Sequence, residues 1–373
     1  MLKVIISGGG TGGHVFPAIA IADAIREKVS TADILFIGAK GKLEMEKVPA
    51  AGYRIEGLGI AGFQRKMTWK NLSFPFKLAA SMLKARKLVS QFRPDIIIGV
   101  GGYASGPVLR TGVSMKIPAL IQEQNSLPGI TNRILAPKVQ KICVAYPGMD
   151  RFFPKEKIVF TGNPIRKDLA GLSEKRKEGL QHFGLKDGRL VLLVIGGSLG
   201  AGTINRSVMS CIMNRQPGGG VQWLWQCGKY SHGKYIHELN VVSGSVEADD
   251  IHLNAFIDRM DLAYAAADVV ISRAGAIAIS ELCVAGKPVI LIPSPNVAED
   301  HQTRNARALA DKHAALMIRD DDAVEALGPA LAGLLADTGQ QEEMRKNISG
   351  LAVTDAASRI ASEALALVGK KEN

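Results

Sequence analysis

Two glycine-rich stretches carry the clearest chemical signal in this 373-residue sequence. Residues 8–14 read GGGTGGH and residues 196–201 read GGSLGA, and each follows a short apolar run and precedes a helix-like stretch. Glycine lets the backbone approach an oxygen-rich ligand, and the N-terminus of a helix offers free N–H groups and the positive end of its dipole. The pattern predicts two phosphate-binding loops; for each loop, a strand-to-helix turn without a ligand is the alternative.

The residues near these two loops indicate which kind of nucleotide they could bind. A nicotinamide dinucleotide site needs an acidic residue at the end of the second strand, but residues 34–37 run into Gly38, Ala39 and Lys40. Neither loop ends in the Lys-Ser/Thr pair of a P-loop. The sequence therefore favours a nucleotide diphosphate as the ligand, and a nicotinamide oxidoreductase is the weaker alternative.

His14 is a candidate general base. It lies at the expected start of a helix, where the dipole disfavours the protonated imidazole. A general base must be neutral before it accepts a proton. A hydrogen-bonded structural histidine is the alternative.

Further polar clusters follow other apolar runs. Residues 99–107 form another glycine turn, and residues 122–125 (QEQN) place four polar side chains at a strand end. Glu281 is expected about two turns into a helix, where a carboxylate suits the vicinal hydroxyls of a ribose. His301 and Gln302 can each donate and accept hydrogen bonds, as sugar hydroxyls require. The clusters favour a sugar-binding edge; solvated loops and surface helices are the alternatives.

The positive charge is confined to the first half of the chain. The net charge is +11, with 23 Lys+Arg against 10 Asp+Glu in residues 1–163, and 23 against 25 in residues 164–373. No acidic residue stands between Glu56 and Asp95. Basic and aromatic residues are interleaved in this segment, and a helix is expected to begin at Pro75. Such a segment suits an anionic membrane surface; a basic surface over an ordinary core helix is the alternative. The residues expected at the membrane are Trp69, Phe76, Lys77, Leu83, Lys84 and Lys87. Nucleic acid is not expected as a partner, because no recognised binding motif accompanies the charge.

The sequence gives little indication of metal or redox chemistry. The four cysteines stand far apart, and no His/Cys cluster has the spacing of zinc ligands. No metal site and no required cofactor are therefore expected. The sequence shows no signal-peptide pattern and no apolar run of about 18 residues, which indicates a cytoplasmic protein.

Short apolar runs alternate with Ala-rich amphipathic stretches along the whole chain. Runs that are apolar throughout are typical of parallel strands covered on both faces. The strand, glycine loop and helix at the start of each half predict an α/β fold with two Rossmann-like parallel-sheet domains facing across a cleft. The expected domains are residues 1–163 and 164–349, with a C-terminal helix at about 350–373 that could pack back on the first.

Taken together, these motifs resemble one enzyme family over about residues 2–365. It is the family of bacterial peptidoglycan glycosyltransferases that add N-acetylglucosamine to undecaprenyl-pyrophosphoryl-N-acetylmuramyl-pentapeptide. The motifs occur in the order of the family: GGGTGGHVFPA at 8–18, GGYASGP at 101–107, EQNSLPGITN at 123–132, GNPIR at 162–166, GGSLGA at 196–201, SRAGAIAISEL at 272–282 and DHQTRNA at 300–306. Seven motifs in register make the resemblance highly specific.

The resemblance implies a GT-B fold, an inverting mechanism and UDP-N-acetylglucosamine (UDP-GlcNAc) as donor. The first domain would bind the lipid-linked acceptor and the anionic membrane, and the second the donor. The positions matched to the donor are Thr11, Gly12, Gly13, Asn125, Arg166, Ser198, Ile257, Ala276, Ile277, Glu281 and Gln302. Among them, Arg166 and Ser198 match diphosphate contacts, and the Ile257 backbone matches the position that reads uracil. Glu281 matches the carboxylate that binds the ribose.

Other matched positions concern the acceptor and the reaction centre. The residues 11–14 match the loop that faces both, and His14 or Glu123 is the expected catalytic base; the helix dipole favours His14. The remaining matched positions are Gly10, Tyr103, Asn132, Asn205, Arg273 and His301. Gln122, Ala278 and His301 differ from residues seen in some members, namely His, Thr and Gln, so Gln122 is not expected to be an obligatory base.

The resemblance also implies a location and partners. The protein would lie peripherally on the cytoplasmic side of the inner membrane and could meet other cell-wall synthesis proteins. Another enzyme that uses a UDP-sugar, such as a UDP-GlcNAc 2-epimerase or a lipid glycosyltransferase, is the first rival function. A nonenzymatic module that binds nucleotide sugars or membranes is the second.

Overall fold

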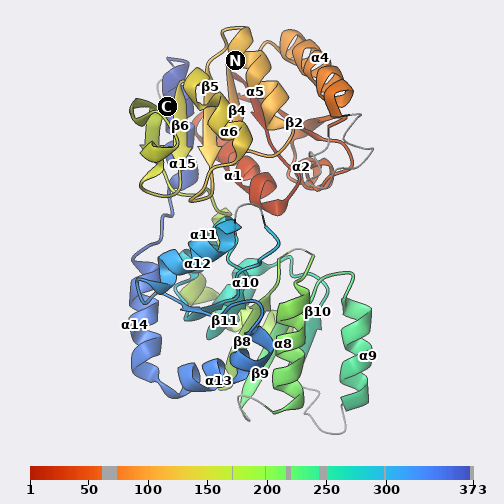
Figure 1. Ribbon diagram of the computed structural model, residues 1–373, viewed down its shortest axis with the longest axis vertical. Helices are drawn as coiled ribbons and strands as arrows, with labels where there is room; N and C mark the ends of the chain where they lie inside the picture. The colour runs from red at the N-terminus through yellow and green to blue at the C-terminus, as the bar shows by residue number, and fades with distance from the viewer. Residues whose placement is uncertain are drawn as a thin grey trace. The chain divides into compact units, whose positions relative to one another are not determined.

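The chain folds into two compact α/β units, which Figure 1 shows with their helices and strands labelled. The computed structural model describes residues 1–60, 74–169, 171–197, 199–215, 220–242, 250–297 and 300–369. The first unit comprises Met1–Arg166 and Val353–Asn373, and the second comprises Lys167–Ala352.

Seven parallel strands form the sheet of the first unit, in the order β3-β2-β1-β4-β5-β6-β7. The strands are β1 (Lys3–Ser7), β2 (Asp33–Ala39), β3 (Arg54–Leu58), β4 (Ile96–Gly99), β5 (Ala119–Glu123), β6 (Lys141–Val144) and β7 (Ile158–Phe160). The helices are α1 (Gly12–Lys28), α2 (Glu44–Ala50), α4 (Phe74–Phe92), α5 (Ser105–Ser114), α6 (Ile130–Leu135) and α15 (Ala356–Leu367), with 3₁₀ turns at Ala136–Lys138, Met149–Arg151 and Lys155–Lys157.

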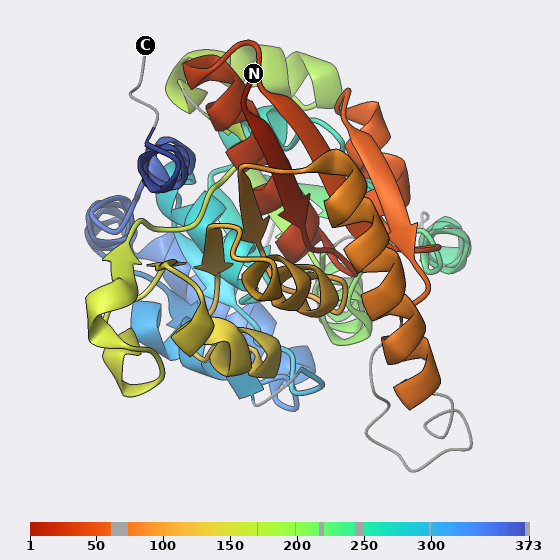
Figure 2. The same cartoon turned by 90° about the horizontal axis from the view of Figure 1, so that it is seen from above.

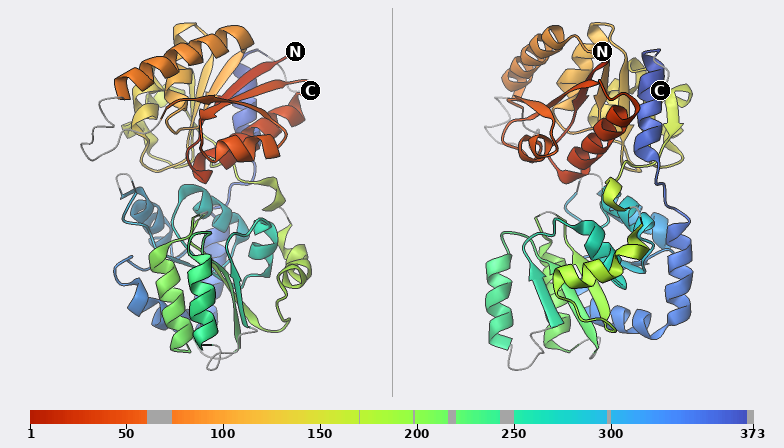
Figure 3. Two further views of the ribbon diagram at one scale, coloured as in Figure 1. Left: turned by 90° about the vertical axis from the view of Figure 1, so that its right-hand side faces the viewer. Right: turned by 180° about the vertical axis from the view of Figure 1, so that it is seen from behind.

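Both faces of this sheet are buried, because successive side chains of a strand point to opposite faces. Val4 and Ile6 of β1 pack with residues of α1 and α15, whereas Ile5 packs with residues of α4 and α5. The C-terminal helix α15 lies beside α1, as the right-hand view of Figure 3 shows. Seen from above, the orange helix α4 runs alongside α5 on the opposite face (Figure 2).

Six parallel strands form the sheet of the second unit, in the order β10-β9-β8-β11-β12-β13. The strands are β8 (Leu190–Ile195), β9 (Val221–Gln226), β10 (Ile251–Asn254), β11 (Val269–Ser272), β12 (Val289–Leu291) and β13 (Leu316–Met317). The helices are α7 (Arg176–Phe183), α8 (Gly202–Met213), α9 (His232–Val242), α10 (Met260–Ala266), α11 (Ala276–Ala285), α12 (His301–Ala310), α13 (Ala323–Ala336) and α14 (Thr338–Ser349), with 3₁₀ turns at Lys167–Leu169 and Leu172–Lys175.

The architecture confirms the prediction of two Rossmann-like parallel-sheet domains. The short strands β3 and β13 were not predicted from the sequence. Both are edge strands, and both are less buried than the central strands. β3 contains the charged Arg54 and Glu56, so it lacks the fully apolar run by which the central strands were recognised, and β13 has only two residues.

Candidate functional site

Each sheet reverses its strand order at one point, and the predicted glycine loops follow strands at that point. In the first sheet, β1 and β4 are neighbours whose next strands lie on opposite sides, and in the second sheet β8 and β11 have the same relationship. Loops that leave such a pair of parallel strands diverge, so a crevice opens at the carboxyl ends of the strands. The fold thus places residues 8–11 in the first unit, and residues 196–197 and 199–201 in the second, where open α/β sheets bind their ligands.

His14 lies in the first turn of α1, directly after the first glycine loop. Its Nδ1 lies 3.2 Å from the hydroxyl oxygen of Thr11, the residue that precedes the helix. The other edge of the ring faces Gly101 in the loop after β4. A Cβ atom at Gly101 would lie only 2.9 Å from Nε2 of His14. The half-buried imidazole is therefore held at the switch point, with its orientation set by Thr11 on one side and Gly101 on the other.

A buried carboxylate that sequence reasoning missed supports the first glycine loop. Glu44 is 1% exposed and accepts hydrogen bonds from the backbone N–H groups of Gly10 and Ala39, each at 2.8 Å. Nothing in the surrounding sequence marks Glu44, because its partners are main-chain groups, one in the glycine loop and one at the end of β2. The contact commits the N–H of Gly10 to the protein and leaves the N-terminus of α1, at Gly12 and Gly13, to meet a ligand.

Glu123, the other candidate base, is the centre of a loop that follows β5. Its carboxylate accepts hydrogen bonds from the backbone N–H of Asn125 (3.0 Å), the backbone N–H of Gly129 (3.1 Å) and Nδ2 of Asn132 (2.8 Å). Nδ2 of Asn125 is a further donor at 3.3 Å. Burial raises the pKa of this carboxyl above its usual range, although these donors oppose the shift. The geometry suits a residue that shapes the 124–132 loop.

Three buried amides connect the end of β5 to the segment that leaves β7. Nε2 of Gln122 donates to Oδ1 of Asn163 at 3.1 Å, and Nδ2 of Asn163 donates to the carbonyl of Gln124 at 3.1 Å. The side chain of Gln124 donates to the carbonyl of Val100 at 2.8 Å. Gln122 therefore has a structural partner in Asn163.

Tyr103 and Arg166 are two further predicted site residues of the first unit. Tyr103 is 53% exposed in the loop after β4. The guanidinium carbon of Arg166 lies 4.9 Å from the ring centroid of Phe16, so this arginine packs over α1.

The predicted membrane residues divide into three groups. Phe76 and Leu83 on α4 are 79% and 72% exposed, and Lys77 and Lys87 are exposed on the same helix. Lys84 instead donates to the carbonyl of Gly57 at 2.8 Å and lies 3.5 Å from the carboxylate of Glu56. Trp69 lies outside the described residues.

In the second unit, the glycine loop packs directly against the chain that follows β9. A Cβ atom at Gly200, where φ is +77°, would lie 2.0 Å from the carbonyl oxygen of Cys227, so only glycine fits there. Asn205 on α8 supports the same chain, because its side chain donates to the carbonyl of Cys227 (2.8 Å) and accepts from the indole N–H of Trp225 (3.1 Å). Asn205 thus has structural partners, and Ser198 lies outside the described residues.

The other predicted donor residues gather around the strand ends of the same sheet. Ala276 and Ile277 begin α11, and Glu281 on that helix is 7% exposed, with the hydroxyl of Tyr264 at 3.3 Å from its carboxylate. The side-chain oxygen of Gln302 on α12 accepts from the backbone N–H of Ser294 at 2.9 Å. His301 is the first residue of α12.

Arg273 follows β11 at the switch point, but its guanidinium is engaged within the unit. It donates to the carbonyl of Ile292 at 2.9 Å and pairs with the carboxylate of Asp320. Asp320 also accepts from the hydroxyl of Thr203 on α8 at 2.9 Å. Arg273 therefore connects the loop after β11 to the start of α8.

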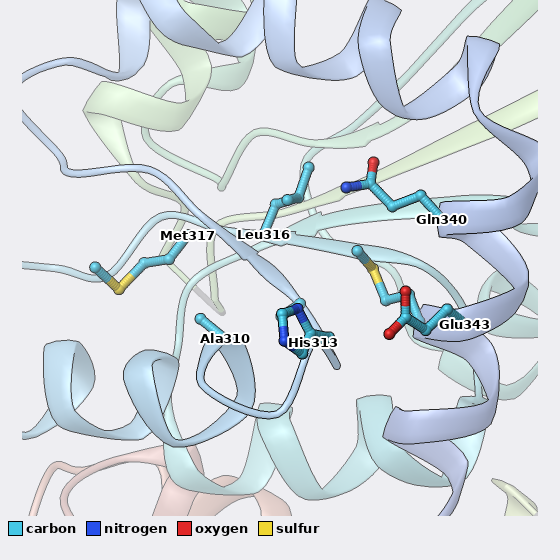
Figure 4. A pocket seen from close by; sticks show the side chains of 8 residues that line it. Ala310, His313, Leu316, Met317, Gln340 and Glu343 are labelled. Atoms are coloured by element: carbon cyan, nitrogen blue, oxygen red, sulfur yellow. The ribbon is translucent and has the colours of Figure 1, made fainter.

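A cavity of about 260 Å³ lies beside β13, between the end of α12 and α14 (Figure 4). His313, Gln340 and Glu343 line it, but none of the predicted site residues does. Within the described ranges, no group of three or more His, Cys, Asp or Glu side chains could hold a metal ion. The helices of the described chain are all too short or too polar to cross a membrane.

Parallel sheets with glycine loops at their switch points are the architecture of nucleotide-binding α/β enzymes. Residues 4–144 match the glycosyltransferase family 28 N-terminal domain, and residues 191–360 match the family 28 C-terminal domain. The chain belongs to glycosyltransferase family 28 and is a glycosyltransferase, as the sequence motifs predicted. This finding sets aside the oxidoreductase and the nonenzymatic module.

Individual relatives agree with this assignment over nearly their whole length. A protein of Phocaeicola vulgatus is 52% identical over 375 residues, covering 100% of this chain and 98% of the relative, and one of Bacteroides thetaiotaomicron is 49% identical, covering 98% of each. Both are named UDP-N-acetylglucosamine--N-acetylmuramyl-(pentapeptide) pyrophosphoryl-undecaprenol N-acetylglucosamine transferase.

Solved structures agree at the level of the fold. The crystal structure of Acinetobacter baumannii MurG has a TM-score of 0.76 at 25% identity, covering 98% of this chain and 100% of that one. A UDP-GlcNAc 2-epimerase from Neisseria meningitidis has a TM-score of 0.69 at 14% identity, which shows a shared fold alone.

Proposed function

We propose that this protein transfers N-acetylglucosamine from UDP-GlcNAc to the 4-hydroxyl of N-acetylmuramic acid in undecaprenyl-pyrophosphoryl-MurNAc-pentapeptide, a step of peptidoglycan synthesis. The observation that carries the proposal is the identity of about 50%, along nearly the whole chain, with transferases named for these substrates. The seven motifs of the site lie within that matched length. The relatives that share only the fold, such as the epimerase, do not match the chain in this way.

The reaction is an inverting displacement at the anomeric carbon of the donor sugar. The acceptor hydroxyl oxygen forms the new bond to that carbon, the bond from the carbon to the UDP oxygen breaks, and UDP leaves with the bonding electrons. The hydroxyl proton passes to Nε2 of His14. The Nδ1 contact with Thr11 supports this role, because a proton on Nδ1 that is donated to the hydroxyl leaves Nε2 as the accepting nitrogen.

The acceptor binds the first unit. Its pyrophosphate is anionic, and residues 1–163 hold the whole positive excess of the chain. Because Glu44 occupies the N–H of Gly10, the pyrophosphate meets the N-terminus of α1 at Gly12 and Gly13. Tyr103, Asn132 and the loop shaped by Glu123 lie at the same carboxyl edge of the sheet.

The donor binds the second unit. The N-terminus of α8 and the loop at residues 196–201 hold the diphosphate, with Arg166 and Ser198 as further contacts. Glu281 accepts hydrogen bonds from the ribose hydroxyls, and the backbone at Ile257 meets the uracil. Ala276, Ile277, Gln302 and Asn125 line the donor. Preorganised donors at a leaving diphosphate each stabilise the transition state by roughly 3 kcal/mol in the best cases.

The protein acts peripherally on the cytoplasmic side of the inner membrane. The exposed apolar side chains of Phe76 and Leu83 stand on the same helix as the exposed Lys77 and Lys87, which suits the interface of an anionic bilayer. Contact with other cell-wall synthesis proteins would follow from this position.

The transferase requires no cofactor of its own. The amide groups of the glycine loops and Arg166 supply the charge stabilisation that a metal ion gives in other transferases. Turnover in excess EDTA should therefore equal turnover in untreated buffer. A rate that falls with EDTA and returns with a divalent cation would contradict this part of the proposal.

The decisive experiment is a transfer assay with radiolabelled UDP-GlcNAc and a short-chain analogue of the lipid-linked acceptor. We expect a labelled disaccharide lipid that depends on both substrates, and Glu281→Gln should raise KM for the donor. Epimerised UDP-sugar without labelled lipid would identify the protein as an epimerase. Donor binding without turnover would overturn the assignment as this transferase.

A further inference from the structure

The glycine loop of each unit is contacted by a buried side chain, but the two contacts have opposite chemistry. Glu44 follows β2, the neighbour of β1, and its carboxylate accepts the backbone N–H of Gly10 at 2.8 Å. Gln226 ends β9, the neighbour of β8, and its Nε2 donates to the carbonyl of Gly197 at 3.0 Å. In the first loop a negative carboxylate therefore occupies a main-chain N–H, whereas in the second a neutral amide occupies a carbonyl.

The first loop is shaped around the Glu44 carboxylate. A Cβ atom at Gly9 would lie 2.1 Å from Oε1 of Glu44, and one at Gly38 in β2 would lie 2.5 Å from its Cγ. Oε1 also accepts the backbone N–H of Ala39 at 2.8 Å. Glu44 is 1% exposed, so glycines on two sides leave the space that it fills. The carboxylate is a fixed part of the loop and not a surface charge that can swing away.

This difference affects how each loop can meet a phosphate. Glycine loops bind phosphate oxygens through their main-chain N–H groups. The Glu44 carboxylate takes one of these groups and places a negative charge beside the loop, where it repels a second anion. Gln226 takes only a carbonyl, which makes no hydrogen bond with a phosphate oxygen. A free diphosphate should therefore bind the first loop less well than the second.

We propose that Glu44 is a specificity-determining residue, whose carboxylate keeps soluble nucleoside diphosphates out of the first unit and leaves the loop at residues 8–14 to the lipid-linked acceptor. The inference rests on the proposed function, which assigns the acceptor to the first unit and the donor to the second. The acceptor tolerates the carboxylate because its pyrophosphate meets the N-terminus of α1 at Gly12 and Gly13. Its sugar, peptide and lipid supply contacts that a free diphosphate lacks.

Two substitutions separate the charge of Glu44 from its length. Glu44→Gln keeps the length and loses the charge, whereas Glu44→Asp keeps the charge and is shorter by one methylene group. The probe is inorganic pyrophosphate, titrated by calorimetry into the full chain while UDP fills its tight site. We expect Glu44→Gln to bind pyrophosphate about tenfold more tightly than the wild type, because a like charge has been removed. Glu44→Asp should bind it no more tightly than the wild type.

The same change should appear in turnover as inhibition by the donor. With the acceptor held near its KM, the wild-type rate should rise to a plateau as UDP-GlcNAc is increased. In Glu44→Gln the rate should pass through a maximum and fall, because the donor also enters the first unit, and additional acceptor should restore it. A merely structural role would not give this result, since damage to the loop weakens binding and does not create it.

Asp95 offers a matched control at the opposite end of β1. Its carboxylate also accepts a main-chain N–H, that of Lys3, at 2.7 Å. Asp95→Asn therefore removes one negative charge from the same unit without altering the glycine loop. It should leave both the dissociation constant of pyrophosphate and the plateau in UDP-GlcNAc as in the wild type.

Several results would overturn the inference. Unchanged or weaker binding of pyrophosphate by Glu44→Gln would show that Glu44 only holds the loop in shape. An equal gain in Asp95→Asn or in Glu44→Asp would also contradict the proposed role of the Glu44 charge. Should Glu44→Gln fail to fold, Glu44→Ala takes its place with the same expected gain. Wild-type protein that makes no labelled lipid would contradict the proposed function itself, and because the titrations need no turnover, the two failures are distinguishable.

Discussion

The imidazole of His14 occupies the space that a side chain at Gly101 would need. A Cβ atom at Gly101 would lie 2.8 Å from Cδ2 and 2.9 Å from Nε2 of the ring, and the φ angle of +89° at Gly101 is one that other residues rarely adopt. The two residues belong to loops that leave β1 and β4, the neighbouring strands at which the first sheet reverses its order. The position of the proposed base thus depends on a glycine more than 80 residues away in the sequence.

Substitution of Gly101 should therefore damage catalysis more than folding. Gly101→Ala must displace the imidazole by several tenths of an ångström or more, and we expect kcat to fall at least about tenfold, because catalysis depends steeply on the placement of the base. Gly59→Ala is the control, since a Cβ there meets no atom within 4 Å. Normal kcat in Gly101→Ala would indicate that His14 has no part in the chemistry.

The two candidate bases can be separated by the pH dependence of turnover. His14→Gln should lower kcat by a factor of about 10² to 10⁴ and remove the fall of kcat at acid pH, because the group that must be neutral is gone. Glu123→Gln should keep the shape of the profile and lower the thermal stability, because the amide cannot accept all of the hydrogen bonds that the carboxylate accepts. The opposite pair of outcomes would assign the base to Glu123.

Membrane binding should depend on the exposed lysines of α4. The double substitution Lys77→Glu, Lys87→Glu should weaken binding to vesicles with anionic lipid by tenfold or more at low salt, since each basic residue near such a surface contributes about 1 kcal/mol. Lys84 is left in place because it is bound to Gly57 and Glu56. The control is Lys312→Glu, Lys346→Glu, which reverses two exposed lysines of the second unit. Equal binding by both variants would remove α4 from the membrane site.

Acid should weaken the second unit through Asp261. The hydrogen bonds from Arg259, at 2.9 Å, lower the pKa of this carboxyl from its ordinary value of 3.8 to about 2. A lowered pKa means that the charged form stabilises the folded state above pH 4 and that this contribution is lost as the pH falls from about 4 to about 2.

The corresponding measurement is the free energy of unfolding in urea. Asp261→Asn should be less stable than the wild type by about 1–2 kcal/mol at pH 7. The difference should shrink at pH 3. A difference of the same size at both pH values would mean that packing, and not the charge of Asp261, is responsible.

The sequence by itself determined the fold class, the family and the position of both glycine loops. It could do so because these features are local: a buried parallel strand is apolar throughout, and a phosphate-binding turn needs glycines immediately before a helix. The edge strand β3 contains Arg54 and Glu56 and lacks this signature, and the edge strand β13 is only two residues long, so both became visible only in the structure.

Only the tertiary structure decided which polar side chains support the loops and which are left to face a ligand. Glu44 binds the backbone of Gly10 and Gln226 binds that of Gly197, in each case a loop residue about 30 positions away in the sequence. Asn205, Arg273 and Glu123 are engaged by their own units. The physical reason is that backbone N–H and C=O groups are the same at every residue. A contact to them leaves no mark in the sequence, so it appears only when the chain has folded and the loops have been brought together.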